Sequence, residues 1–517
     1  MISQDIPLHH LCARSLAGDP TQPAIDYGGK WTCWGQLREV ADRLEALMRQ
    51  SEIPAAAPVV FVPRNRPSAI AAFLGLLAQA RTVRMAYAFQ SPFALARELE
   101  GLSPTVVLAD AEDFSPEVCA VLRAQGAAGI ALREVDVELL RGLDGARRGM
   151  PAAVPSPPKV EVLTSGTTGA PKRFGLAHDD VARHIVGANK NYQAQDVDYS
   201  QRAPAFLYYP LANISGIYTI LPTLLIGHRM QLVERFSVEA WRDHIRRYRP
   251  ERASLPPAGL QMVLDADVPP EELAGVRSIA TGAAPLEPSI HRAFEARYGI
   301  PVLQSYGATE FAGPVTSMTP ELHAQWGQSK FGSVGRPIAG ARLRIVDAET
   351  GQALPPGYEG ILEVVAPRIG PDWIRTSDIA VIDADGFLFH KGRADGAIVR
   401  GGFKLLPETI ERALLLHPSV AAALVLGLPD QRLGQVPAAI VEIRRGTPQP
   451  TIADLERHLR DRVYATHIPV AWRFVDDLPR TPSLKADRPT ARRMFERSGD
   501  IDDSVAAGAS RTFVLTK

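Results

Sequence analysis

LTSGTTGAPKR, residues 163–173, carries three hydroxyl side chains, two glycines and a lysine between Ser165 and Lys172. It follows the run VEVL at 160–163, which predicts a strand, and it precedes a segment that we expect to be helical. Glycines leave the backbone free to wrap around an anion, and hydroxyl and amide groups donate hydrogen bonds to it. The stretch is no Walker loop, because Pro171 separates the second glycine from the lysine and Arg173 stands where Ser or Thr would bind magnesium. We therefore predict a phosphate-cradling loop of another kind.

Outward from this loop, short β-branched runs alternate with longer amphipathic segments over residues 30–310. Such alternation is typical of βαβ units, so we predict an α/β fold with mainly parallel sheets. We expect strands at 59–62, 105–110, 160–163, 253–255, 278–281 and 302–305, and helices at 68–80, 238–248 and 287–298.

The pattern changes after Gly332, where the runs ARLRIVD and GILEVVA and a hairpin turning at Asp385-Gly386 predict an antiparallel, β-rich subdomain. A smaller α+β unit follows the hairpin, with a helix expected at 407–416, strands at 422–426 and 438–443, and a helix at 452–464. We therefore predict a large N-terminal domain over residues 1–394 and a small C-terminal domain over 395–517. The Pro-rich run at 150–158 predicts a surface connection inside the large domain.

Composition and charge narrow the class of protein. The 517 residues are 46% hydrophobic and 22% charged, which is typical of globular chains, and 57 cationic residues balance 57 anionic ones. A neutral chain gives no electrostatic reason for bulk binding to nucleic acid. The three cysteines have no metal-site or disulfide spacing, the start lacks a secretory pattern, and the apolar runs at 69–78 and 214–227 are too short to span a membrane. We expect a cytoplasmic protein with no membrane span.

Five further motifs follow the loop along the chain in this order: GAAPL (282–286), QSYGATE (304–310), RTSD (375–378), KGRADGAIVRGGFKLLPETIE (391–411) and LPRTPSLKADR (478–488). Together with the loop they resemble the adenylate-forming superfamily of acyl-CoA synthetases, adenylation domains and luciferases. The resemblance covers nearly the whole chain. It implies that the large domain binds ATP and a carboxylic acid, and that a mobile C-terminal domain carries a catalytic lysine.

The resemblance also implies a nucleotide site. Tyr306 would cover the adenine with its flat ring, Asp378 would accept hydrogen bonds from both ribose hydroxyls, and Arg393 would add a donor. The residues that would hold the phosphates or lie along the purine are Thr164, Ser165, Gly166, Thr167, Thr168, Gly169, Lys172, Gly282, Ala283 and Ala284.

Three residues would carry the chemistry by the same resemblance. Thr309 would contact the α-phosphate, and Glu310 would hold Mg²⁺, which prefers carboxylate and phosphate oxygens. Lys485 would bridge the attacking carboxylate and the phosphate in the transition state. Leu484 stands where related sequences usually have glycine.

Coenzyme A is the second expected ligand. The resemblance implies that the small domain turns about Asp395 and that its other face, with Gly401, Gly402 and Lys404, admits the pantetheine thiol. The cofactors and co-substrates implied are ATP, Mg²⁺ and coenzyme A.

The acid itself is less defined. By resemblance the acyl pocket is lined by Asn213, Gly216, Gly307 and Phe311, which predicts an apolar pocket with one hydrogen-bonding amide. The stretch 208–222 lacks a Phe-Asp pair to receive an amino group, so we do not expect an α-amino acid. Aryl, alicyclic and medium-chain acids remain open.

The leading interpretation is an acid–thiol ligase that forms an acyl-adenylate and then an acyl-CoA. One alternative is a stand-alone enzyme that loads an acyl carrier protein, and another is a non-catalytic or half-reaction homologue that binds an adenylate. Luciferase-like oxygenation also uses this scaffold, since fold alone does not fix function. A homodimer is compatible with these features.

Overall fold

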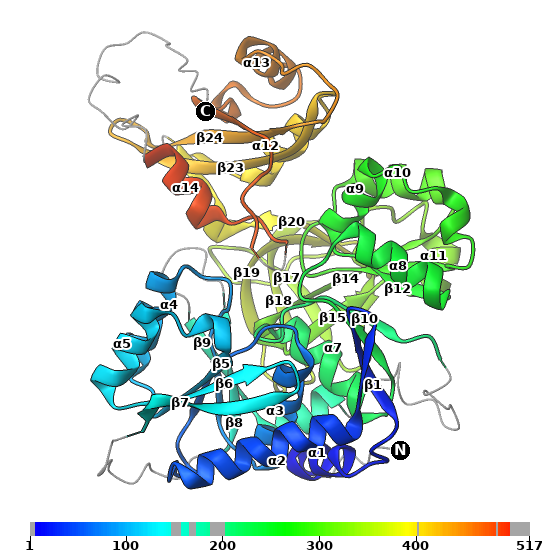
Figure 1. Cartoon of the computed structure of the whole chain (residues 1–517). Helices are drawn as coiled ribbons and strands as arrows, with labels where there is room; N and C mark the ends of the chain where they lie inside the picture. Colours follow the sequence, from blue (N-terminus) through cyan, green and yellow to red (C-terminus); the bar gives the residue numbers. More distant parts are fainter. Residues whose placement is uncertain are drawn as a thin grey trace.

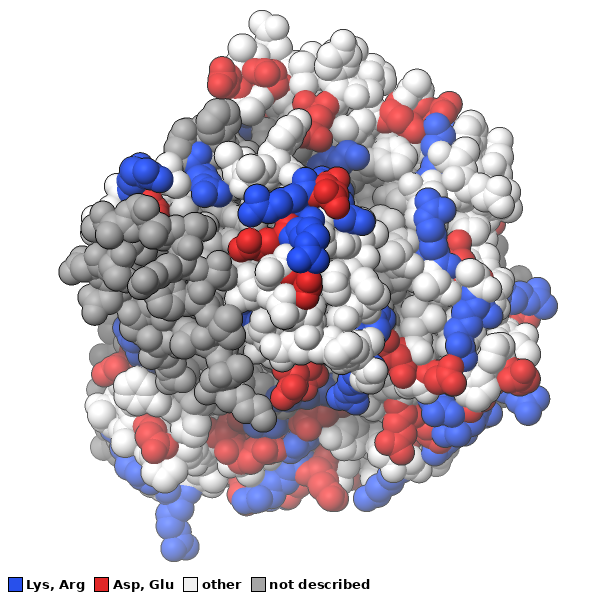
Figure 2. Space-filling view, turned by 90° about the horizontal axis from the view of Figure 1, so that it is seen from above, with Lys and Arg blue, Asp and Glu red and all other residues white. Residues whose placement is uncertain are grey.

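The computed structural model of the chain describes residues 6–145, 157–164, 172–186, 202–400, 403–481 and 484–496 (Figure 1). The predicted α/β architecture is confirmed: a large N-terminal part has mainly parallel sheets and a β-rich portion, and a smaller C-terminal part lies beyond it. On the face seen in Figure 2, cationic and anionic side chains are interspersed, as the neutral composition leads one to expect.

The first sheet has seven strands in the order β7-β6-β5-β3-β4-β8-β9. Its five inner strands are parallel and its two edge strands antiparallel. The strands are β3 (Val59–Val62), β4 (Val83–Met85), β5 (Val106–Asp110), β6 (Ala128–Arg133), β7 (Asp136–Asp144), β8 (Lys159–Thr164) and β9 (Lys172–Ala177).

Helices cover both faces of this sheet. α3 (Pro67–Ala78) is apolar all round because it lies between the sheet and two further helices, α1 (Leu8–Leu16) and α2 (Trp34–Gln50). The opposite face packs on α4 (Pro92–Leu102) and α5 (Pro116–Gln125). Because β4 and β5 flank β3 on opposite sides, the carboxyl ends of β3 and β5 form a topological switch point, where open α/β sheets commonly bind ligands.

Two further sheets complete the parallel part of the large domain. One has the order β10-β11-β1-β2 and the other β12-β13-β14-β15-β16. Their strands are β1 (Pro23–Tyr27), β2 (Lys30–Cys33), β10 (Ala205–Leu207), β11 (Met230–Leu232), β12 (Arg252–Ser254), β13 (Ser278–Thr281), β14 (Val302–Ala308), β15 (Gly313–Ser317) and β16 (Arg336–Pro337). The helices among them are α7 (Ile214–Leu225), α8 (Val238–Tyr248), α9 (Pro257–Asp265), α10 (Pro288–Tyr298) and α11 (Pro320–Trp326).

The β-rich portion is an antiparallel sheet of β17 (Arg342–Val346), β18 (Glu359–Val365), β19 (Ile374–Ile382) and β20 (Leu388–Arg393). The chain then enters a unit whose two apolar clusters consist of residues from Ile398 onward. Its elements are β21 (Ile398–Arg400), β22 (Phe403–Leu405), α12 (Pro407–Leu415), β23 (Val420–Asp430), β24 (Gly434–Ile443), α13 (Ile452–Arg460), β25 (Ala471–Val475) and α14 (Arg488–Glu496).

Two expectations about elements were wrong. The segment after residue 171 is not helical: β9 pairs antiparallel with β8, so the two strands flank the predicted phosphate loop. Helical structure begins only after β9, with a turn at His178–Asp180 that continues as a π-helical segment, Val181–Val186. The helix expected over 452–464 ends at Arg460, where Asp461 caps it, and a 3-10 turn follows at Ala465–His467. Within the described ranges, no helix is both long and apolar enough to cross a membrane.

Candidate active site

Three predicted nucleotide ligands lie on strands of two sheets. Tyr306 lies on β14, while Asp378 on β19 stands opposite Arg393 on β20 in the ladder register. The Tyr306 hydroxyl donates a hydrogen bond to Oδ2 of Asp378. On the other carboxylate oxygen, His390 Nε2 lies 3.3 Å from Asp378 Oδ1. The tyrosine predicted for adenine and the aspartate predicted for ribose are therefore direct neighbours.

The carboxylate of Asp378 is kept charged by its neighbours. Burial by itself would raise the pKa of Asp378, but the hydrogen bonds from His390 and Tyr306 and the charge of Arg393 outweigh it, so the pKa lies below its usual value. Burial and the adjacent carboxylate hold the pKa of Tyr306 well above its ordinary value. A neutral phenol beside an ionised carboxylate is a stable donor–acceptor pair, and it leaves each carboxylate oxygen a second lone pair.

Arg393 ties this cluster to the predicted hinge. Its guanidinium contacts Asp395 through two hydrogen bonds, Nε to Oδ1 at 2.9 Å and Nη2 to Oδ2 at 2.7 Å. Ser377 Oγ lies between them, accepting from Arg393 Nη2 at 2.6 Å and donating to Asp395 Oδ2 at 3.0 Å. The bond to Asp395, followed by the charge of Asp378, raises the pKa of Arg393, so the guanidinium remains cationic.

Lys485 reaches this same cluster from the C-terminal unit. Burial and the positive charge of Arg393 lower the pKa of Lys485, whereas the negative charge of Glu310 raises it, and the net shift is downward. The residue nevertheless stays open to solvent. A bound polyanion such as a triphosphate would add negative charge beside Lys485 and Arg393.

Leu484, beside this lysine, has φ of 60°, a left-handed conformation that favours glycine. Its side chain packs against an apolar cluster of the large domain that contains Phe294 and Ile279. This explains the departure from the usual glycine: the leucine accepts backbone strain, and its side chain is anchored on the large domain.

Thr309 and Glu310 begin a short 3-10 turn, Thr309–Phe311, immediately after β14. Thr309 is half-buried and Glu310 exposed. The structure holds no cluster of three or more His, Cys, Asp or Glu side chains fit for a metal within its described ranges. A lone carboxylate at Glu310 nevertheless suits Mg²⁺, which is commonly bound by one or two carboxylates together with substrate phosphates.

The predicted purine-contact stretch lies where two strands approach closely. A Cβ added at Gly282 would come within 2.6 Å of Ser305 Oγ. A Cβ added at Gly307, a predicted acyl-pocket residue on the neighbouring strand β14, would come within 2.4 Å of Gly313 O. Ala283 has φ of 66°, which strains a residue other than glycine. Ala284 follows it in the same turn after β13.

Two of the predicted acyl-pocket residues, Asn213 and Gly216, lie at the start of α7. Asn213 precedes the helix without capping it, and its buried Oδ1 has no hydrogen-bond partner among the residues described. A Cβ at Gly216 would lie 2.2 Å from Pro210 O, so helix and loop are in close contact. Phe311 is fully buried in an apolar cluster, with its ring 6.1 Å from that of Tyr306. An unpaired buried amide oxygen is costly, and a substrate donor would relieve that cost.

Several predicted residues lie outside the described ranges: Ser165, Gly166, Thr167, Thr168, Gly169, Gly401 and Gly402. Thr164 and Lys172 are the facing ends of β8 and β9 and pair in register, while Lys404 lies on β22. Arg173 fixes β9 to its neighbours by donating to Met85 O at 2.7 Å and to Glu98 Oε1 at 2.9 Å.

Two polar residues of the cluster were missed in the sequence. His390 contacts Asp378 from the neighbouring strand, and Ser377 joins Arg393 to Asp395. The turn predicted at Asp385-Gly386 could have indicated that His390 lies near Asp378. Counting outward from that turn along the hairpin brings the segment 390–393 opposite the segment 378–380.

Comparison with known families defines the class of protein. Residues 12–370 match the family described as "AMP-binding enzyme", and residues 409–485 match its C-terminal domain. The chain belongs to the AMP-binding enzyme family, as its motifs predict.

Particular relatives narrow the group. The chain is 32% identical to a sulfoacetate–CoA ligase of Cupriavidus necator, over 66% of this chain and 67% of that protein. It is 28% identical to 4-coumarate–CoA ligase 3 of Oryza sativa subsp. japonica, over 98% of this chain and 95% of the other. A fatty acid–[acyl-carrier-protein] ligase of Streptomyces coeruleorubidus is 29% identical over 66% and 68%.

Solved structures agree on the fold. ATP-bound MatB from Rhodopseudomonas palustris superposes with a TM-score of 0.75 at 22% identity, covering 95% of this chain and 99% of that one. The o-succinylbenzoate CoA synthetase of Bacillus subtilis with its acyl-adenylate gives 0.71 at 22% identity, covering 94% and 98%.

Proposed function

We propose that this chain is an AMP-forming acid–thiol ligase, which activates a carboxylic acid with ATP and transfers the acyl group to coenzyme A. The observation that carries the proposal is the convergence of Lys485, Glu310 and Arg393 from different elements beside the Tyr306–Asp378 pair. CoA-ligase relatives that cover almost the whole chain support it.

The nucleotide would be held first. Asp378 would accept both ribose hydroxyls, because it is kept ionised and each oxygen retains a free lone pair. Tyr306 would present its ring to the adenine, with its hydroxyl already engaged by Asp378 and therefore fixed in orientation. The loop that includes Ser165–Gly169 and ends at Lys172 would cradle the outer phosphates, and Gly282, Ala283 and Ala284 would line the purine.

In the first half-reaction a carboxylate oxygen of the acid attacks the α-phosphorus and pyrophosphate departs, leaving a mixed anhydride. Lys485 and Thr309 would stabilise the charge that accumulates between the two reactants. Mg²⁺, held by Glu310 and the nucleotide phosphates, would supply charge neutralisation for the departing pyrophosphate. The downward-shifted pKa of Lys485 would recover as these anions arrive.

In the second half-reaction the thiol attacks the acyl carbon and AMP leaves. The C-terminal domain, residues 395–517, would turn relative to residues 1–394 about Asp395, bringing Gly401, Gly402 and Lys404 to a pantetheine channel. The bidentate pair of Arg393 with Asp395 would have to rearrange during this turn.

For the acid, Asn213 offers one buried acceptor among Gly216, Gly307 and Phe311, which favours an acid carrying one hydrogen-bond donor on an otherwise apolar body. A second acceptor for the acyl group, the pantetheine thiol of an acyl carrier protein, is favoured by the relative that is such a ligase. We expect a cytoplasmic enzyme.

The test is pyrophosphate release from ATP against a panel of aryl, alicyclic and medium-chain acids, with coenzyme A, with a carrier protein, or with neither. We expect acid-dependent release that coenzyme A stimulates. Stimulation by carrier protein alone would favour the second acceptor, and no release with any acid would contradict the adenylation chemistry.

A further inference from the structure

The segment Arg64-Asn65-Arg66 lies at the switch point of the seven-stranded sheet, after β3 and immediately before α3. Asn65 is 2% exposed and the two arginines are partly exposed. It belongs to none of the nucleotide or acid motifs.

Asn65 spans the gap between two sheets with its amide group. Nδ2 donates to Tyr209 O at 3.0 Å and to Val233 O at 3.2 Å, and Oδ1 accepts from Leu211 N–H at 3.0 Å. These three partners follow β10 and β11, strands of a different sheet. Because a buried carbonyl or amide left unpaired is costly, the amide fixes these three backbone groups in one arrangement.

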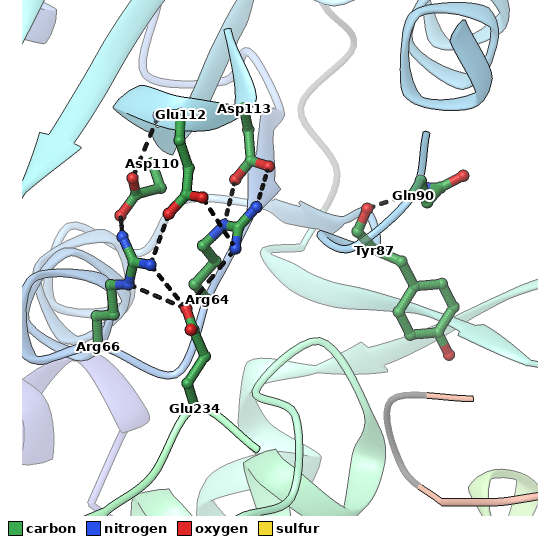
Figure 3. A network of polar contacts seen from close by, with 8 residues as sticks. All are labelled: Arg64, Arg66, Tyr87, Gln90, Asp110, Glu112, Asp113 and Glu234. Carbon is green, nitrogen blue, oxygen red and sulfur yellow. Dashed lines mark hydrogen bonds and ion pairs between the residues drawn. The ribbon is translucent and has the colours of Figure 1, made fainter. Parts of the chain in front are cut away.

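The arginines on either side hold the same junction by ion pairs (Figure 3). Arg64 binds Asp113 through Nε at 2.9 Å and Nη2 at 2.8 Å, and Arg66 binds Asp110 at 2.7 Å. Arg66 Nε also donates to Glu234 at 3.0 Å, next to the Val233 carbonyl that Asn65 holds. Arg64 and Asp113 are nearly buried and joined by two hydrogen bonds, so this ion-pair network and the buried Asn65 amide hold the junction together.

The backbone that Asn65 holds leads directly to the acid pocket. Tyr209 and Leu211 flank Pro210, whose carbonyl accepts from Asn213 N–H at 3.0 Å. The same carbonyl lies where a Cβ at Gly216 would come within 2.2 Å, so Pro210 packs directly against the start of α7. Asn65 therefore acts indirectly on Asn213, whose buried Oδ1 has no hydrogen-bond partner among the described residues.

We propose that Asn65 is a positioning residue for the acid: its three hydrogen bonds set the 209–213 loop and thereby the polar wall of the acyl pocket. This inference rests on the proposed function, since it takes the start of α7 to line the acid site. A misplacement of about 1 Å at a reacting group can cost about 10²-fold in rate, so this loop need move only slightly.

The test variant is Asn65→Asp, which keeps the shape and the acceptor for Leu211 N–H but cannot donate to Tyr209 O or Val233 O. Asn65→Ser serves if the buried carboxylate prevents folding. The matched control is Ser333→Ala, because Ser333 is also 2% exposed, and its Oγ bridges Leu388 O and Gly335 N–H in another part of the fold.

Pyrophosphate release should show the KM for the acid raised about 10-fold or more in Asn65→Asp, with the KM for ATP changed less than about twofold. Ser333→Ala should move neither KM, even at an equal loss of thermal stability. Combining Asn65→Asp with Asn213→Leu should give less than the product of the two separate losses. Equal changes in both KM values, or fully independent effects with Asn213→Leu, would overturn the proposal.

Amide hydrogen exchange tests the role of Asn65 independently of whether the proposed function is right. Exchange at Leu211 and Asn213 should quicken in Asn65→Asp and not in Ser333→Ala, and unchanged exchange there would overturn the inference. A parent enzyme that activates no acid would instead overturn the proposed function, while this exchange measurement would still judge the role of Asn65 in holding the loop.

Discussion

Lys485 is brought close to Arg393 and Glu310 by an element more than 90 residues further along the chain than either of them. Replacing it with alanine should slow acyl-adenylate formation by about 10²-fold or more, because a preorganised charge-stabilising donor is lost. The thioester step from supplied acyl-adenylate should suffer much less. Lys330→Ala, which removes a lysine paired with Asp383, is the control and should affect neither step. Equal losses in both half-reactions of Lys485→Ala would contradict the assignment.

Asp378 offers a second test at this scale. Asp378→Ala should raise the KM for ATP, since two ribose hydroxyls lose their acceptor. Replacement of ATP by 2′-deoxy-ATP should then lower the kcat/KM of the variant by a smaller factor than it lowers the kcat/KM of the parent. Additive penalties would show that this carboxylate serves Tyr306 and His390 and does not bind the ribose.

Asn213 can reveal the substrate. Asn213→Leu should weaken acids that carry an oxygen or nitrogen donor and improve hydrocarbon acids of similar volume, because a site that hydrogen-bonds its substrate discriminates strongly against analogues lacking that group. The measurement is kcat/KM across a matched acid pair. Lower stability with an unchanged acid preference would assign Asn213 to the fold.

Motif order predicted which residues would meet: Tyr306 and Asp378 are 72 positions apart and in contact. It could not predict that Arg393 would pair with the hinge residue Asp395, or that His390 would complete the carboxylate's hydrogen bonds. Such contacts depend on strand register and side-chain direction, which short motifs do not specify.

At the scale of elements, the start of α10 and helix α12 line one pocket, to which Glu287 and Arg412 contribute. Burial raises the pKa of Glu287, just before α10, to about 7 against the opposing charge of Arg412. Burial likewise raises the pKa of Glu411 on α12 to about 7 against the charge of Arg488. Both groups bind protons more tightly here than in solvent.

The sign of the pH effect follows. A carboxyl with a raised pKa favours this arrangement below its ordinary titration range, and the advantage is lost as pH rises towards about 7. We therefore expect acyl-adenylate formation, which needs Lys485 in place, to fall relative to the thioester step as the pH rises from about 4.5 to about 7. In Glu287→Gln the ratio of the two rates should depend less on pH, and at the upper end of this pH range it should differ a few-fold from the ratio in the parent. An unchanged ratio would rule out this interface as a source of pH dependence.

Some elements were predictable from the sequence to the residue, and others were not. The helix at 238–248 and the strand at 278–281 have their predicted bounds. β9 was taken for helix because its six residues, KRFGLA, carry too little pattern, and pairing with β8 decides its conformation. α13 stops at Arg460 although apolar residues continue, since Asp461 and the following 3-10 turn end it.

At the scale of the whole molecule, one chain supplies the nucleotide cluster from its large part and the lysine from its small part. The Arg393–Asp395 pair and the Arg412 bond to Lys391 O at 2.9 Å hold the two parts in this relation. For the proposed reaction, the large and small parts of the chain must first join an acid to AMP, and then transfer the acyl group to a thiol with release of AMP.

The most direct measurement follows the oxygen atoms. An acid labelled with oxygen-18 in its carboxylate, identified from the pyrophosphate panel, is turned over with ATP and coenzyme A, and the AMP is analysed by mass spectrometry. We expect one labelled oxygen in the AMP, because the carboxylate oxygen that attacks the α-phosphorus stays on that phosphorus when the thiol displaces AMP. Unlabelled AMP, or label in inorganic phosphate with ADP as the nucleotide product, would contradict it.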